Sequence, residues 1–146
     1  MYEPHFGLKM RPFGETVDPS AYVPLSSRDA ALRRLRYGLE RGAGPGLVVG
    51  PTGSGKTLLA RRLAGERNAA AVHLVFPAMP PAELLAYLAD ELGAPPATGL
   101  GMAASVRRLR EAFAGAAARG RKLLLIVDEA HLIDDEATFE ALRLLL

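Results

Sequence analysis

Residues 48–60 read VVGPTGSGKTLLA. Two valines lead into a turn that contains three glycines, and the turn ends in Lys56 and Thr57 before an apolar helix-forming run. Glycines let successive backbone N–H groups converge on an anion, because no Cβ atom stands in the way. The unpaired N–H groups and the dipole at the start of the following helix favour the same anion. The stretch therefore predicts a phosphate-binding turn between a strand and a helix.

The spacing of Gly50, Gly55, Lys56 and Thr57 matches the P-loop pattern, which binds a nucleoside triphosphate such as ATP. We expect Lys56 to reach the β- and γ-phosphates and the Thr57 hydroxyl to bind Mg²⁺. The alternative is a glycine turn that only connects two elements, and the flanking strand and helix favour phosphate binding. The predicted nucleotide-binding residues are Gly50, Pro51, Thr52, Gly53, Ser54, Gly55, Lys56 and Thr57.

A second candidate site lies in KLLLIVDEAH, residues 122–131, where an apolar strand ends in two carboxylates. Beside a P-loop, Asp128 is expected to hold Mg²⁺. Glu129 points differently and can polarise the attacking water as a general base. Alone, such a pair would be better explained as solvating a strand end; with the P-loop, the catalytic interpretation is favoured. His131 is more often a solvated or coupling residue than a ligand, and a role in nucleotide sensing stays open.

The length and composition of the chain limit the number of domains and the classes of function that it can have. The chain has 146 residues, which favours one domain. Its net charge of +2 is too balanced to argue for nucleic acid, and the absence of cysteine excludes disulfides and thiolate metal sites. The start carries no apolar signal peptide. The longest interior aliphatic run, Leu123 to Val127, is far below the ~20 residues of a membrane span, so we expect a cytoplasmic protein.

Strands alternate with helices along the chain, which predicts an α/β protein with a parallel sheet between two helix layers. Three apolar segments are predicted as buried strands: 47–49, 71–76 and 122–127. Helices are predicted over 26–40, 56–67, 81–92 and 102–120, and from about 135 onward. Capping is predicted at two of them, by Ser26 with Asp29 and by Asp134. Met102, Val106, Leu109 and Phe113 are expected on the inner face of the fourth helix.

The chain also resembles a known family. The N-terminal MYEPHFGLKMRPF, then Asp18-Pro19 and Tyr22, GPTGSGKT, LLLIVDEAH and LRLLL together look like the AAA+ ATPases of the general secretion pathway protein A type, which are similar to transposition helper ATPases. The resemblance implies a three-layer P-loop NTPase of the AAA+ type. Residues 1–26 would form an arm near the nucleotide, with Pro12 and Phe13 by the adenine unless Phe13 is only core. Residues 27–146 would form the N-terminal part of the ATPase domain, in which His131 stands where the family more often has glutamine.

The same resemblance implies ATP and Mg²⁺ as cofactors, Lys56 and Glu129 in catalysis, and self-association as an AAA+ oligomer. It also implies a protein partner, either a membrane secretion component or a transposase, and inner-membrane association if a span follows. Turnover would be coupled to assembly of that partner complex. The alternatives are a nucleotide-gated switch with little turnover, a transposition helper ATPase or a DEAH-type helicase. Direct nucleic-acid binding stays open, since the arginines at 33, 34, 36, 107, 108 and 110 are more simply solvated helix faces.

Family members carry further parts after the position of Leu146: a strand with a polar sensor, an arginine finger and a helical lid. The resemblance therefore predicts that this sequence stops before them, with the missing strand falling between 48–49 and 123–127. An arginine finger is worth about 10³ to 10⁵ in rate, so the fragment would bind ATP yet hydrolyse it hardly at all. Arg143 is a weak candidate within the chain, and a solvent-facing helix residue is the simpler interpretation.

Overall fold

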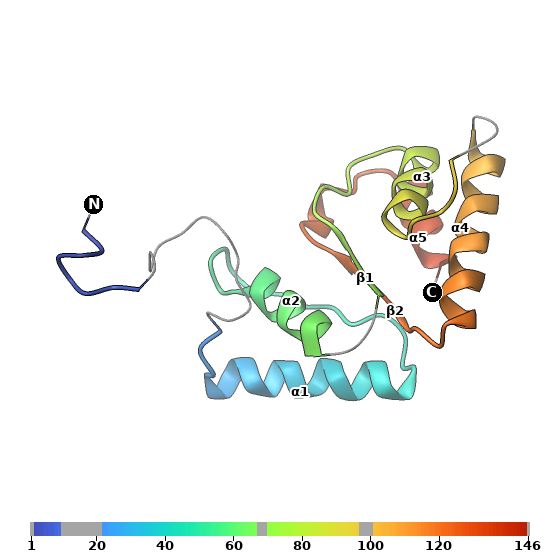
Figure 1. Cartoon of the computed structure of the whole chain (residues 1–146). Helices are drawn as coiled ribbons and strands as arrows, with labels where there is room; N and C mark the ends of the chain where they lie inside the picture. Colours follow the sequence, from blue (N-terminus) through green and yellow to red (C-terminus); the bar gives the residue numbers. More distant parts are fainter. Residues whose placement is uncertain (1, 10–21, 67–69, 97–100, 146) are drawn as a thin grey trace.

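The computed structural model describes residues 2–9, 22–66, 70–96 and 101–145. The elements follow in the order α1 (Ser26–Arg41), α2 (Lys56–Glu66), β1 (Ala70–Leu74), α3 (Pro81–Glu91), α4 (Met102–Ala118), β2 (Leu123–Val127), a 3₁₀ turn η2 (Ala130–Leu132) and α5 (Glu136–Arg143). Figure 1 shows the two strands in the middle of the molecule, with α1 and α2 to one side and α3, α4 and α5 to the other. The expected arrangement of a parallel sheet between helix layers is therefore present, with a sheet of two strands among the described residues.

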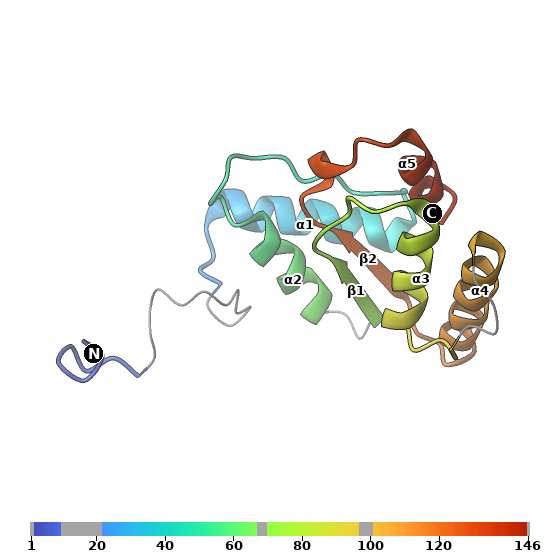
Figure 2. The same ribbon diagram turned by 90° about the horizontal axis from the view of Figure 1, so that it is seen from above.

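The sheet positions the end of each strand beside the other. β1 and β2 pair in parallel, with the register running from Ala70 opposite Leu123 to Leu74 opposite Val127. One further bond, from the Asp128 N–H to the Leu74 carbonyl at 2.9 Å, continues the pairing past the strands. The carboxyl ends of both strands therefore meet at one edge, which is where α/β proteins usually place their ligands. The view from above in Figure 2 shows this pair between α2 and α3.

Apolar side chains form two clusters. The larger one joins one face of the sheet to α3, α4 and α5, and its buried members are Val72, Leu74, Leu84, Leu85, Leu88, Ala89, Leu109 and Leu142. The smaller one joins α1 to α2 through buried Leu32, Leu59 and Leu63. Burial of these side chains, rather than helix propensity, supplies most of the stability of helices this short.

The strand predicted over 47–49 is wrong for this structure. Residues 42–50 have no helix or strand assignment, and the side chains of Leu47 and Val49 are 82% and 83% exposed. A strand needs a hydrogen-bonded neighbour, and none of the described residues pairs with this segment. Only Val48 packs inward, against the cluster between α1 and α2. For the same reason β2, expected to be fully buried, is only half-buried, since β1 is its one partner among the described residues.

Three local predictions are also wrong. Leu25 is the N-cap of α1 and makes no side-chain cap bond; Asp29 instead accepts a bond from the Tyr22 hydroxyl at 2.7 Å. Asp135, one residue beyond Asp134, caps α5 and accepts from the N–H groups of residues 137 and 138. Met102 is 45% exposed rather than buried, because it lies at the first position of α4, where the packed face has not yet begun.

The N-terminal arm is described only in part. Residues 2–9 form an exposed turn, and Pro12 and Phe13, predicted to lie by the adenine, fall outside the described residues. The proposed division at residue 26 is therefore untested. Across the described ranges, each helix is too short or too polar to cross a membrane.

Candidate functional site

The loop from Gly50 to Gly55 runs directly into α2 and adopts a conformation that requires glycine. Gly53 and Gly55 have φ values of 76° and 89°, which side chains rarely allow. A Cβ atom at Gly50 would lie 3.0 Å from the Ser54 Oγ, closer than ordinary packing. The glycine spacing read from the sequence therefore corresponds to real steric requirements in a loop at the N-terminus of a helix, the usual position for a bound phosphate.

Lys56, the first residue of α2, folds back onto this loop. Its ammonium group donates to the carbonyls of Gly50 and Pro51 at 3.0 and 3.2 Å. The charge thus lies at the mouth of the turn, partnered by neutral carbonyls rather than by a carboxylate. An arriving phosphate offers charged acceptors, which make stronger bonds to an ammonium group than carbonyls do.

The two residues predicted to hold Mg²⁺ are in direct contact. The Thr57 hydroxyl, at the start of α2, donates to the Asp128 Oδ2 at the end of β2 over 2.7 Å. The other oxygen, Oδ1, accepts the Glu129 N–H at 3.1 Å. A hydroxyl and a carboxylate side by side are hard oxygen ligands of the kind that Mg²⁺ prefers. No described cluster of three or more His, Cys, Asp or Glu residues offers an alternative metal site.

A third donor to Asp128 is His73, a residue that the sequence analysis did not single out. The His73 Nε2 lies 3.3 Å from the same Oδ2, and both side chains are mostly buried. His73 belongs to β1 opposite Ile126, two residues before Asp128 in the neighbouring strand. A polar residue inside an otherwise apolar strand was the available signal, because such a residue needs a partner.

These contacts set the charge state of Asp128. Burial by itself raises the pKa of this carboxyl, but bonds from Thr57, the Glu129 N–H and His73 outweigh burial and hold the pKa below the usual 3.8 of an aspartate. Asp128 is thus ionised near neutral pH, as a cation ligand must be.

Glu129 has an unusual backbone. Its φ of 48° places it in the left-handed region, where non-glycine residues are uncommon, and strain of this kind clusters at functional sites. The Glu129 side chain is 52% exposed, and its Oε2 lies 3.3 Å from the His131 Nδ1. The two adjacent carboxylates therefore lie in different surroundings, as the sequence analysis expected.

The structure shows the surroundings of two arginines for which the sequence suggested a solvent-facing position. Arg143 forms bonds of 2.9 and 3.1 Å to Glu140 on its own helix and remains 66% exposed, which agrees with a solvent-facing role. Arg108, predicted to be a solvated residue, is only 11% exposed: it joins α4 to the Asp90 carboxylate and donates to the Pro95 carbonyl at 2.7 Å. That prediction was wrong because the loop after α3 folds back over α4.

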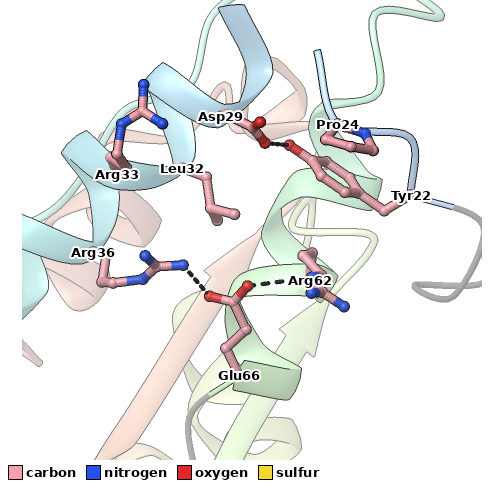
Figure 3. A pocket seen from close by; sticks show the side chains of 8 residues that line it. All are labelled: Tyr22, Pro24, Asp29, Leu32, Arg33, Arg36, Arg62 and Glu66. Carbon is pink, nitrogen blue, oxygen red and sulfur yellow. Dashed lines mark hydrogen bonds and ion pairs between the residues drawn. The ribbon is translucent and has the colours of Figure 1, made fainter. Parts of the chain in front are cut away.

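A hollow of about 380 Å³ lies between α1 and α2, close to the chain that enters α1. Figure 3 shows Glu66 between Arg36 and Arg62, and Tyr22 pointing to Asp29. The Arg36–Glu66 and Arg62–Glu66 ion pairs measure 2.5 and 3.2 Å. The lining carries three arginines and two carboxylates, a net charge of +1, so the hollow between the two helices is not a strongly basic site.

Comparisons with known proteins agree with this geometry. The AAA domain family matches residues 39–146. General secretion pathway protein A of Aeromonas hydrophila is 33% identical over an alignment of 149 positions, which covers 99% of this chain. No solved structure matches.

The chain therefore belongs to the AAA domain family and has its P-loop NTPase fold. Within that family it is similar to general secretion pathway protein A, and it spans 27% of the length of that relative.

Proposed function

We propose that this chain is the nucleotide-binding part of a Mg²⁺-dependent ATPase. The observation that carries the proposal is the 2.7 Å contact between Thr57 and Asp128. These residues are far apart in the sequence, and their meeting joins the end of the glycine loop to the end of a strand. That is the arrangement in which a P-loop hydroxyl and a strand-end aspartate hold one metal ion together.

Each residue has a distinct role in this proposal. The backbone N–H groups of Gly50 and of residues 52–57, together with the Lys56 ammonium, bind the phosphate tail, while Thr57 and Asp128 hold the cation. Held there, the cation would supply positive charge that stabilises the negative charge developing during phosphoryl transfer. Glu129, turned out of the Asp128 pair by its left-handed backbone, orients and deprotonates the attacking water.

The experiment measures ATP binding by calorimetry and phosphate release by the purified full-length protein with Mg²⁺. Lys56→Ala should abolish nucleotide binding. Glu129→Gln should bind ATP with nearly unchanged affinity but lose turnover, so that ATP stays bound. Glu136→Gln, an exposed position in the first turn of α5, is the matched control and should behave as wild type. Intact turnover in Glu129→Gln would refute the assigned mechanism.

A nucleotide-gated switch with little turnover is the second candidate. It is favoured by the surroundings of the Glu129 carboxylate, which is half-exposed and has its Oε2 3.3 Å from the His131 Nδ1. It predicts that a non-hydrolysable ATP analogue supports full partner binding or self-association, and that Glu129→Gln changes neither.

For the partner, we propose a component of a secretion complex, on the basis of the similarity to general secretion pathway protein A. Turnover would then drive assembly of that complex. Co-purification of such a component in ATP but not in ADP supports this assignment. Association with a transposase instead would move the chain to the transposition helpers.

A further inference from the structure

Besides Lys56, a second cation lies against the phosphate loop. A Cβ atom at Gly55 would lie 3.6 Å from the guanidinium carbon of Arg28 and 3.7 Å from its Nε and Nη2. Arg28 is half-buried in the first two turns of α1. Across the described residues, no carboxylate forms an ion pair or hydrogen bond with its guanidinium. A half-buried guanidinium beside a glycine loop, with no carboxylate partner among the described residues, has donors free to bind an anion at that loop.

The helix packing explains why Arg28 reaches the loop. Residues 28, 32, 35 and 39 follow a spacing of four, three and four, so they share one face of α1. Leu32 on that face is buried against Leu59 and Leu63 of α2. α1 and α2 begin on the same side of the molecule (Figure 1), so the position one turn before Leu32 lies beside the start of α2. The packing of Leu32 against α2 therefore also positions Arg28 beside Gly55.

We propose that Arg28 is a second cationic ligand of the nucleotide's phosphate tail, supplied by α1 at the Gly55 side of the loop. This inference rests on the proposed function, since it assumes that the loop binds a nucleoside polyphosphate. A guanidinium group is suited to this task because its fixed fork of N–H donors can bind two phosphate oxygens at once. Lys56 supplies a point charge from within the loop, whereas Arg28 links phosphate binding to the position of α1.

The test is calorimetric titration of the purified protein with ATP and with ADP in the presence of Mg²⁺, at low and high salt. Arg28→Met keeps the apolar stem but removes the charge, and Arg28→Lys keeps a charge but loses the fork. Arg33→Met is the matched control, because Arg33 lies on the exposed side of the same helix. We expect Arg28→Met to weaken the affinity for both nucleotides about tenfold and to reduce its salt dependence. Arg28→Lys should lose less, and Arg33→Met should stay within about twofold of wild type.

The outcomes separate this inference from the function on which it rests. If wild-type protein and Lys56→Ala are equally unable to bind ATP, the proposed function fails. If wild-type protein binds through Lys56 while Arg28→Met binds equally well, the function stands and the role of Arg28 is overturned. The role is also overturned if Arg33→Met is as weak as Arg28→Met. Equal weakening by the Met and Lys variants, with a lowered unfolding midpoint, would make Arg28 a packing residue and likewise reject the inference.

Discussion

Replacing Asp128 by asparagine separates the folding role of this residue from the role in cation binding that we propose for it. In the structure, Oδ1 accepts the Glu129 N–H, and Oδ2 accepts from Thr57 and faces His73. Asparagine retains one oxygen for the Glu129 N–H. Its NH₂ group can donate to the Thr57 hydroxyl, which can rotate to act as an acceptor, and to a neutral His73 ring.

The expected cost to stability is small. Hydrogen bonds to a charged group contribute about 1.5 to 3 kcal/mol and neutral ones about 1 kcal/mol, so the substitution weakens each bond without leaving a partner unpaired. Removing the charge also removes the desolvation penalty of a carboxylate whose side chain is only 14% exposed. We expect Asp128→Asn to lower the free energy of unfolding by about 1 kcal/mol, a small part of the total for a domain.

The expected effect on function is large. An amide oxygen carries no net charge and is a poor substitute for a carboxylate on Mg²⁺. Even residues that only orient a metal ligand contribute about 10- to 100-fold in affinity, so a ligand itself should contribute at least as much. The assay titrates ATP with Mg²⁺ and again with EDTA: wild-type affinity should drop on chelation, whereas Asp128→Asn should be weak in both conditions.

The matched control is Asp134→Asn, which changes an exposed aspartate in the same connection between β2 and α5. It should leave both stability and Mg²⁺-dependent affinity unchanged. The reasoning is refuted if Asp128→Asn keeps the wild-type response to Mg²⁺. It is also refuted if the variant unfolds, because the hydrogen bonds would then not be replaceable as argued.

Further predictions concern stability. Thr138→Val should lower the free energy of unfolding by about 1 to 2 kcal/mol in urea denaturation, because Thr138 is 2% exposed and its hydroxyl lies within hydrogen-bond distance of the Met79 carbonyl (3.1 Å) and the Asp135 Oδ2 (2.9 Å); Thr138→Ser should recover most of it. Leu84→Ala should cost about 2 to 5 kcal/mol, since Leu84 is 0% exposed, whereas Leu144→Ala, at a site 74% exposed, should change stability by less than about 0.5 kcal/mol. The pKa of Asp128 is lowered on folding, so its carboxylate stabilises the protein above the unfolded value of 3.8. The stability advantage of wild type over Asp128→Asn should therefore shrink as the pH falls through the lower folded pKa, and an advantage that grows on acidification would contradict the assignment.

The AAA+ resemblance was confirmed by the family match and by the relative of 33% identity, and the layered α/β class was confirmed in a smaller form. Element positions were predicted well where an apolar pattern was long, as for α3 and α4. The segment 47–49 was predicted as a strand from its composition alone, but a strand depends on a neighbour that composition does not supply. The caps failed for a related reason: Asp29 had a competing donor in Tyr22, and Asp135 rather than Asp134 was in reach of the free N–H groups of α5.

Sequence alone determined the glycine loop of this protein, because its conformation depends on local steric freedom at Gly50, Gly53 and Gly55 and on the helix that starts at Lys56. Tertiary structure decided everything that joins distant segments. Parallel pairing brings His73 level with the end of β2, and packing of α2 beside it sets Thr57 against Asp128. In the same way, packing of α1 on α2 positions Arg28 beside Gly55 of the glycine loop. Such contacts depend on which surfaces are buried together, a property of the folded chain as a whole that no short pattern contains.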